Sequence, residues 1–185
     1  MSGPANSLDD TQRFALKTLK EKLGEGYEGH RIERDGTPVA TVAAGFIVEA
    51  LTLLRDDPEI SYRVLTDLTS VDYGAGKREP RYVVVYNLLS RKYVSRLRLE
   101  VGVAEGEESV PTVTGVHAVA DWLEREVFDL MGIRFEGHPD LRRIQLPEDY
   151  DGHPLRKEFP VRGGYRQVRR PEEPLPTHGH RFRTR

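Results

Sequence analysis

The chain has 185 residues, 37% of them hydrophobic and 31% charged, a balance that predicts one compact domain with an appended segment and a strongly polar surface. It contains no cysteine, which excludes a disulfide framework, a thiolate zinc site, a cysteine nucleophile and an iron–sulfur cluster bound by this chain. The formal net charge of −2 divides unevenly, because residues 161–185 hold seven arginines and two glutamates while residues 1–160 have seven more acidic than basic residues.

The amino-terminal residues lack the basic start and the apolar stretch of a secretory signal, so we expect a cytoplasmic protein. The longest nearly apolar run, residues 39–54, is interrupted by Gly45 and Glu49. It is also shorter than the roughly 20 residues that a membrane-spanning helix needs. We therefore expect no direct insertion into a bilayer.

The first predicted element is a helix that ends at Gly24. Apolar side chains within residues 15–23 recur at helical spacing, and a glycine directly after such a pattern is typical of a helix end. Ser7 and Asp10 form a capping-box-like start, with aspartate in place of the usual glutamate.

A hairpin and a second helix are predicted next. Residues 29–34 and 38–43 flank Asp35-Gly36, a dipeptide that favours a tight turn because both positions tolerate positive φ. Apolar side chains within residues 46–54 then line one helical face, and a proline shortly after them ends the pattern.

The second half of the chain predicts three strands and a third helix. Residues 62–68, 82–89 and 94–103 contain β-branched and aromatic side chains and read as a meander of strands. Residues 116–130 repeat apolar side chains at intervals of three and four and stop at Gly132. Beyond that glycine we expect extended chain with at most short strands.

This order of elements favours an α+β fold, a two-layer sandwich in which about three helices cover a mixed or antiparallel sheet, followed by an extended C-terminal tail. We predict an α+β domain over residues 1–132, an extended segment over residues 133–160 that packs on the domain and on partners, and an arginine-rich tail over residues 161–185. No glycine-rich phosphate loop is present, so NADH is not expected to bind by the usual route.

The most informative residues lie at the end of the third helix and after it. Residues 124–143 read EREVFDLMGIRFEGHPDLRR, and residues 152–160 read GHPLRKEFP. Upstream, residues 65–73 read LTDLTSVDY and residues 82–90 read YVVVYNLLS. Over roughly residues 60–160 the chain resembles the C subunit of NADH-quinone oxidoreductase, respiratory complex I. We call residues 133–160 the signature segment.

The resemblance implies a subunit of the hydrophilic arm that carries no catalytic residues and no cofactor. Iron–sulfur clusters, FMN and quinone would belong to partner subunits, and the complex would pass electrons from NADH to quinone and translocate protons. The implied partners are the D subunit, which forms the quinone pocket, and the iron–sulfur B subunit, on the cytoplasmic side of the bacterial inner membrane. Related subunits occur in membrane-bound hydrogenases, which leaves that alternative open.

The resemblance also implies which residues serve as signature or subunit-interface positions. They are Glu124, Arg125, Glu126, Asp129, His138, Pro139, Asp140, Arg142, Arg143, Pro154, Leu155, Arg156 and Lys157. On a helix Arg125 lies four residues from both Asp121 and Asp129, so we predict that its guanidinium bridges two carboxylates as the hub of the site. The charged groups either meet partner chains or form a network within this chain, and both readings stay open.

Two catalytic alternatives have little support in the spacing of the residues. His138, Asp140, His153 and the pair His178 and His180 are metal-ligand types, but no His-Glu-x-x-His pattern accompanies them, which leaves a metal-dependent hydrolase improbable. Glu124 and Glu126 could form an acid–base pair only if both faced one substrate. Alternate positions on a helix point about 200° apart, which excludes that geometry.

The arginines of residues 161–185 suggest an acidic partner surface or a polyanion. Nucleic acid is the third alternative, but the acidic body and the lack of a binding motif argue against it. A solvated, structureless end is the simplest reading of this tail.

Overall fold

The computed structural model describes residues 8–160, and residues 1–7 and 161–185, including the arginine-rich tail, lie outside the described part. The elements in chain order are α1 (Asp10–Leu23), β1 (Tyr27–Ile32), β2 (Pro38–Val42), α2 (Ile47–Asp56), β3 (Val64–Asp72), β4 (Tyr82–Ser90), β5 (Ser95–Val103), β6 (Ser109–Pro111), α3 (Ala120–Met131) and β7 (Arg134–Glu136). Short 3₁₀ turns, Gly24–Gly26 and Ala44–Phe46, precede β1 and α2.

Five strands form one mixed sheet in the order β1-β2-β5-β4-β3. The hairpins β1-β2, β3-β4 and β4-β5 are antiparallel, whereas β2 runs parallel to β5, with Ala40 opposite Leu99. A parallel neighbour requires a crossover connection, and here the crossover contains α2, β3 and β4. The predicted mixed α+β sandwich is confirmed.

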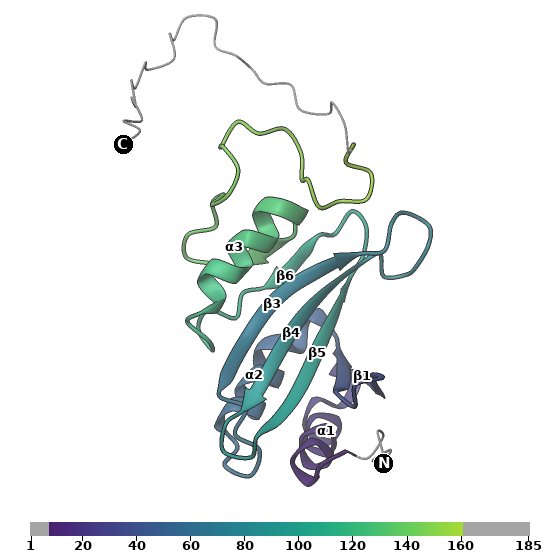
Figure 1. Ribbon diagram of the computed structural model, residues 1–185, viewed down its shortest axis with the longest axis vertical. Coiled ribbons are helices and arrows are strands. Elements are labelled where there is room, and N and C mark those ends of the chain that lie inside the picture. The colour runs from purple at the N-terminus through teal and green to yellow at the C-terminus, as the bar shows by residue number, and fades with distance from the viewer. Residues whose placement is uncertain (1–7, 161–185) are drawn as a thin grey trace, which may run out of the picture.

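A single apolar core joins the sheet to all three helices. Along β4 the side chains of Tyr82, Tyr86 and Leu88 belong to this core together with residues of α1, α2 and α3. Alternate positions of a strand point to opposite faces, which explains why every second residue of β4 takes part. Figure 1 shows α1 and α2 at one end of the sheet and α3 at the other end, beside β3.

Two predicted helix starts are wrong. α1 begins at Asp10 with Asp9 as its N-cap, and Asp9 forms the capping box with Gln12 in place of the predicted Ser7 and Asp10. α3 begins at Ala120 because residues 113–119 form two successive turns that the apolar spacing does not distinguish from helix.

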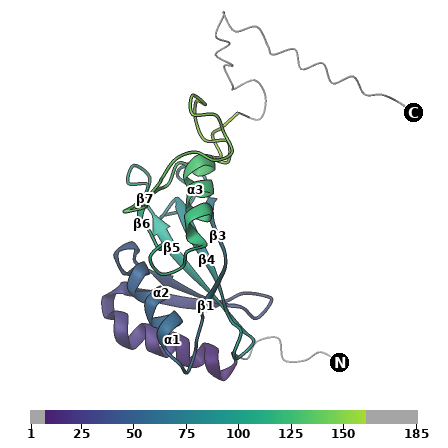
Figure 2. The ribbon, with the colours of Figure 1, turned by 90° about the vertical axis from the view of Figure 1, so that its left-hand side faces the viewer.

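The signature segment leaves α3 as a short strand and then continues without helix or strand over residues 137–160. β7 pairs in parallel with β6 in a two-stranded sheet of its own. Figure 2 shows the rest of the segment gathered at the α3 end of the molecule. Within residues 8–160 no helix is both long and apolar enough to cross a membrane.

Candidate functional site

α3 buries polar side chains in addition to its apolar stripe. Ala120, Val127 and Met131 pack into the core, and the polar side chains of Glu124 and Asp129 are fully buried beside that stripe. Burial of a carboxylate is unfavourable unless hydrogen bonds or cations compensate. The partners of these two carboxylates therefore define the site.

The Asp129 carboxylate organises the first half of the signature segment. Its Oδ2 accepts the backbone N–H groups of Ile144, Gln145 and Leu146 at 3.0, 2.7 and 2.9 Å, and its Oδ1 accepts Arg143 Nη1 at 3.0 Å. Burial opposes the charged form, but these four donors outweigh it and lower the pKa of Asp129. The carboxylate thus holds a turn of backbone that has no secondary structure of its own.

Arg143 extends this contact to residues further along the segment. Besides Asp129, its guanidinium donates to the carbonyls of Tyr150 at 3.2 Å and Gly152 at 3.4 Å. A guanidinium carries five N–H donors in one plane, so it can donate to several acceptors at once. Residues 143–152 therefore close into a loop around a single arginine.

The last carbonyls of α3 receive the second half of the segment. The contacts join His153 Nδ1 to the Asp129 carbonyl at 2.9 Å, the Leu155 N–H to the Leu130 carbonyl at 3.0 Å, and Arg156 Nε to the Met131 carbonyl at 2.7 Å. These carbonyls lack partners within the helix and form the negative end of its dipole, so N–H donors and a cation stabilise them.

Gly132 is required at this helix end for two reasons. Its φ of 74° lies in the left-handed region, where its N–H bonds the Phe128 carbonyl and closes the helix. A Cβ at this position would also lie 2.5 Å from His153 Nε2 and 2.8 Å from Arg156 Nη2. The predicted helix stop at Gly132 is confirmed, and the glycine additionally admits the segment.

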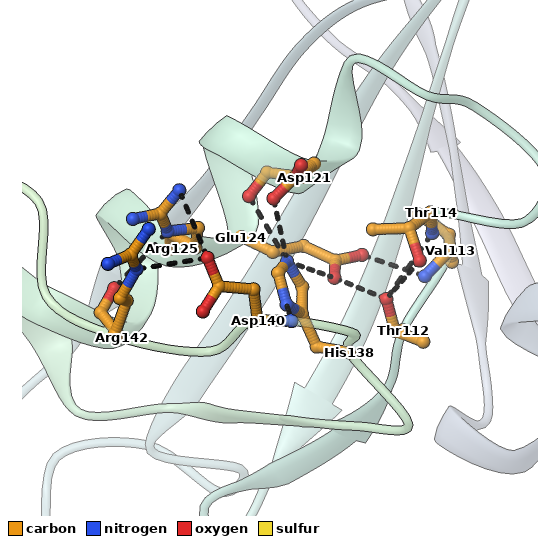
Figure 3. Close-up of polar contacts among 9 residues, drawn as sticks. All are labelled: Thr112, Val113, Thr114, Asp121, Glu124, Arg125, His138, Asp140 and Arg142. Atoms are coloured by element: carbon orange, nitrogen blue, oxygen red, sulfur yellow. Dashed lines mark hydrogen bonds and ion pairs between the residues drawn. The ribbon is translucent and has the colours of Figure 1, made fainter.

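Glu124 and His138 form a second buried group (Figure 3). The Glu124 carboxylate accepts Thr112 Oγ1 at 2.5 Å and the Val113 N–H at 2.7 Å, and His138 Nε2 lies 3.9 Å away. Burial raises the pKa of Glu124, although the two hydrogen bonds and His138 act in the opposite direction. This carboxylate ties α3 to the connection after β6.

His138 is held at both ring nitrogens and its side chain is fully buried. Nδ1 accepts the Asp140 N–H at 3.0 Å, so in the neutral ring the proton lies on Nε2. Nε2 lies 3.2 Å from the Asp121 carbonyl oxygen and 3.3 Å from the Asp121 carboxylate. The imidazole therefore connects the signature segment to the first turn of α3.

The predicted hub at Arg125 is wrong in its partners. Arg125 donates to the Arg142 carbonyl at 3.3 Å and approaches the Asp140 carboxylate at 4.0 Å (Figure 3). It also lies over the ring of Trp122, 4.8 Å from the ring centroid. Asp129 pairs with Arg143 instead. Helical spacing shows which side chains share one face of α3, but it does not reveal which other chain segment packs against that face. The signature segment packs there and supplies the partners of both Arg125 and Asp129.

A further buried cluster was not predicted from the sequence. Asp72, at the end of β3, accepts Arg81 Nε at 3.0 Å and Nη2 at 3.1 Å, and also the backbone N–H of Lys157 at 2.7 Å. Arg81 pairs in addition with Glu105 and Glu158. The hydrogen bonds from Arg81 and from backbone N–H groups hold the pKa of Asp72 well below its usual range, although burial acts to raise it.

This cluster anchors the far end of the signature segment to the sheet. The only signal in the sequence was that Asp72 falls within the family-like run over residues 65–73. Its partner Arg81 lies next to the residue opposite it in the β3-β4 hairpin, where Asp72 faces Tyr82. The register of that hairpin decided the pairing.

The predicted site residues all lie on α3 or on the signature segment, but they differ in exposure. Glu124, Arg125 and Asp129 are buried and bonded within the chain. Glu126 accepts Gln145 Nε2 at 2.7 Å. The members that reach the surface are Pro139, Asp140, Arg142, Leu155 and Lys157, while Pro154, Arg143, Arg156 and the His138 residue as a whole are intermediate.

Exposed apolar groups accompany these residues. Trp122 on α3 is 62% exposed and Leu155 is 57% exposed. Trp122 is not among the site residues predicted from the sequence. An exposed tryptophan beneath a guanidinium is the type of residue that dominates protein–protein contacts.

Of the residues named for the metal alternative, the three that the structure describes do not form a metal site. Within residues 8–160 no group of three or more histidine, aspartate or glutamate side chains could hold a metal ion. His138 and His153 bond the carbonyls of Asp121 and Asp129, respectively. His178 and His180 lie outside the described residues.

Comparisons with known proteins agree on one family. Residues 40–165 match the family described as "Respiratory-chain NADH dehydrogenase, 30 Kd subunit". The C subunit of the NADH-quinone oxidoreductase of Geobacter sulfurreducens is 46% identical over 160 residues, which cover 86% of this chain and 96% of that protein.

Solved structures show the same fold. A trypsin-resistant fragment of Nqo5 is similar with a TM-score of 0.58 and 32% identity, covering 68% of this chain and 97% of the fragment. A chain of the membrane-bound sulfane sulfur reductase, an archaeal respiratory membrane complex, has a TM-score of 0.65 at 22% identity and covers 80% of this chain and 85% of its own. At that identity the likeness concerns the fold alone.

Proposed function

The chain belongs to the family of the 30 kDa subunit of respiratory-chain NADH dehydrogenase, and from this premise we propose that it is a non-catalytic, cofactor-free subunit of the peripheral arm of a bacterial NADH-quinone oxidoreductase. It supports assembly and stability of the quinone-reducing module, whose electron transfer is coupled to proton translocation. FMN, iron–sulfur clusters and quinone are held by partner subunits. The complex lies at the cytoplasmic side of the inner membrane, with this chain as a peripheral member.

One observation carries the proposal: the charged residues of α3 and the signature segment bond one another and thereby shape an ordered surface. The buried carboxylates of Glu124 and Asp129 are engaged by groups of the same chain, so neither is available to a substrate. A catalytic acid or base must reach the proton that it transfers. The dense charge of the signature is therefore best explained by architecture.

The proposed contact surface consists of the exposed side chains that this architecture displays. Trp122 and Leu155 offer apolar area, and Arg142, with its side chain 67% exposed, offers a planar donor for carboxylates of a neighbour. We propose that this surface meets the quinone-pocket D subunit and the iron–sulfur B subunit. The arginine-rich residues 161–185 would extend the contact.

An equivalent subunit of a related membrane-bound hydrogenase is the alternative. The 22% identity to a chain of a sulfane sulfur reductase supports only a common fold, whereas the identity to the C subunit of an NADH-quinone oxidoreductase is 46% over nearly the whole of that relative. The second similarity favours the NADH-quinone oxidoreductase.

Coexpression with the D and B subunits of the same organism tests the proposal. Trp122→Ala and Arg142→Ala should each reduce the complex recovered on an affinity-tagged D subunit, and the tryptophan should matter more because truncation at the centre of an interface commonly costs about 2 kcal/mol or more. Phe14→Ala and Arg34→Ala remove an exposed aromatic and an exposed arginine from other parts of the surface and are the matched controls. Full recovery with both test variants, or a chain that never copurifies with these two subunits, would overturn it.

A further inference from the structure

A cationic groove lies at the start of β3, on the outer edge of the five-stranded sheet. It consists of two adjoining hollows of about 440 Å³ each, which share Arg63 and Val64. One hollow continues toward Arg91 and Lys92 in the β4-β5 turn, and the other toward residues 116–119 in front of α3. We call this feature the β3 groove; it is lined by Arg55, Pro58, Ser61, Arg91, Lys92 and residues 63–65 and 116–119.

The backbone at this edge is open on one side. β3 is the last strand of the sheet and pairs only with β4, so among residues 8–160 no strand covers its outer side. α3 packs against the later part of β3, where Leu68, Thr69 and Ser70 face Val127 and Leu130, and Figure 1 shows the start of β3 extending beyond α3. An uncovered strand edge presents N–H and C=O groups to any extended chain that lies beside it.

The open edge is short. Thr66 is an extra residue in β3, because Leu65 lies opposite Leu88 and Asp67 already lies opposite Asn87. Such a bulge ends regular pairing and bends the strand. β3 begins at Val64, and the N–H of Arg63 before it already donates to the Ser61 carbonyl at 2.9 Å. Only Val64 and Leu65 therefore offer a regular edge, which limits an added strand to a short contact and protects the sheet from extended self-association.

The charge of the β3 groove is opposite to that of the rest of the body. Arg55, Arg63, Arg91 and Lys92 line it, and no carboxylate does so among the described residues, although residues 1–160 have seven more acidic than basic residues. Arg55 is neutralised by Asp56, and Lys92 donates to the Pro58 carbonyl. Arg63 and Arg91 are exposed and have no ion pair among the described residues.

Apolar and polar groups of the groove point to a peptide rather than a small ion. Val119 is 50% exposed, and Val64 lies between the two hollows, so apolar area is available on both sides of the guanidinium groups. His117 is buried at the wall of the second hollow, and its Nε2 has no hydrogen-bond partner among the described residues. That nitrogen has essentially no exposed surface, so the apolar area beside the guanidinium groups is what favours a peptide.

We propose that the β3 groove binds a short extended segment of a second polypeptide, in which apolar and acidic residues alternate. The segment pairs with the backbone of Val64 and Leu65, places its carboxylates on Arg63 and Arg91, and packs its apolar side chains on Val64 and Val119. Side chains of an extended chain alternate between two sides, which matches this arrangement. Residues 161–185 of this chain are excluded as the occupant, because their seven arginines would meet cations.

The groove reaches Val119, three residues before Trp122 in the chain, but the proposal does not rest on the proposed function. It is tested with the full chain and a fluorescent seven-residue peptide of alternating valine and glutamate. We expect saturable binding that weakens about tenfold in the double variant Arg63→Glu, Arg91→Glu. The double variant Arg13→Glu, Arg34→Glu makes the same change of charge at exposed sites elsewhere and should bind as the unmodified chain does.

Hydrogen–deuterium exchange then locates the peptide. Bound peptide should slow exchange of the amides of Val64 and Leu65, whereas a peptide with lysine for glutamate, or one with alternate N-methyl groups, should not. Equal binding by the two double variants would overturn the proposal, and so would protection outside the β3 groove. If inorganic polyphosphate displaces the peptide, and the chain also binds the N-methylated peptide, the groove would be assigned to polyanions. If the chain forms a dimer that dissociates in the double variant Arg63→Glu, Arg91→Glu, the β3 groove would be assigned to a second copy of this chain.

Discussion

The body of the molecule and its signature segment are stabilised in different ways. In the body, strands and helices satisfy their own backbone groups and bury apolar side chains such as Leu19, Leu51 and Leu99 in one core. Residues 137–160 have no helix or strand. Isolated turns bond part of their backbone, and the carboxylates of Asp129 and Asp72 accept four further backbone N–H groups. A chain without regular structure becomes ordered when a few buried charges accept several of its N–H groups.

The same contrast appears between two carboxylates of α3. Asp129 accepts four donors, one of them a guanidinium, and its pKa is lowered, whereas Glu124 accepts two neutral donors and its pKa is raised. Both side chains are fully buried. The number and charge of the donors decide which of the two pKa values is lowered and which is raised.

The largest effect should come from the core of the body. Leu99→Ala removes a fully buried side chain on β5 that lies between Ala40 and Tyr86 of the neighbouring strands. We expect the free energy of global unfolding to fall by about 3 kcal/mol, because a cavity is added to the lost burial. Denaturant melts followed by circular dichroism measure it. A change below about 1 kcal/mol would show that the sheet is not the centre of the core.

A smaller and local effect should follow from Asp129→Asn. The amide cannot accept all four donors and leaves Arg143 without its carboxylate, which should cost about 2 kcal/mol. The loss should appear as opening of the signature segment, with trypsin cleavage after Arg142 or Arg143 about 30-fold faster, since each 1.4 kcal/mol is tenfold in the open population. Glu126→Gln, on the same helix with one partner, is the control. Unfolding of the whole body in step with the segment would contradict the division into two regions.

Acid should release the segment before the body. Asp72 and Asp129 have pKa values below the ordinary value of about 3.9, so their stabilisation is fully present above it and is lost as the pH falls toward the folded-state pKa values. His153 acts earlier, because burial lowers its pKa and the unfolded form takes up a proton first as the pH falls through about 6.5.

Trypsin is inactive in acid, so pulsed hydrogen–deuterium exchange between pH 7 and 3 is the measurement. Protection of residues 143–157 should decline in two steps, and His153→Gln should remove the upper one. At pH 4 the loss of protection should be smaller than the loss caused by Asp129→Asn, because only a fraction of the Asp72 and Asp129 carboxylates is protonated at that pH. A segment that stays protected until the body unfolds would refute the anchoring role of these groups.

The smallest effect should come from Glu124→Gln. A raised pKa means that the folded chain binds a proton more readily than the unfolded chain, so this carboxyl weakens stability as the pH rises from about 4.5 toward neutrality. Glutamine is neutral at every pH, its one oxygen can accept the Val113 N–H, and its NH2 group can donate to Thr112 Oγ1. We expect a change within about 1 kcal/mol at pH 7. A loss as large as that of Asp129→Asn would show that Glu124 acts as a buried anion.

Much of the fold could be predicted from the sequence, and much of the site could not. The three strands of the second half, the hairpin at Asp35-Gly36 and the helix end at Gly132 follow from periodicity and turn residues within about ten positions of each other. The wrong predictions, at Ser7, at residues 116–119 and at Arg125, arose where a local pattern allowed two structures. The family could be recognised because its signature covers more than thirty positions.

Local order in the sequence determined the helices, the strands and their apolar faces, because side-chain periodicities of 3.6 and 2 depend only on near neighbours. Tertiary structure alone decided that β2 runs parallel to β5, that Asp129 takes Arg143 from 14 residues away, and that Asp72 holds the Lys157 backbone across 85 residues. Such pairings depend on which chain segments meet after folding. A charged side chain bonds the partner that burial brings to it, and the sequence order of the charges does not reveal that partner.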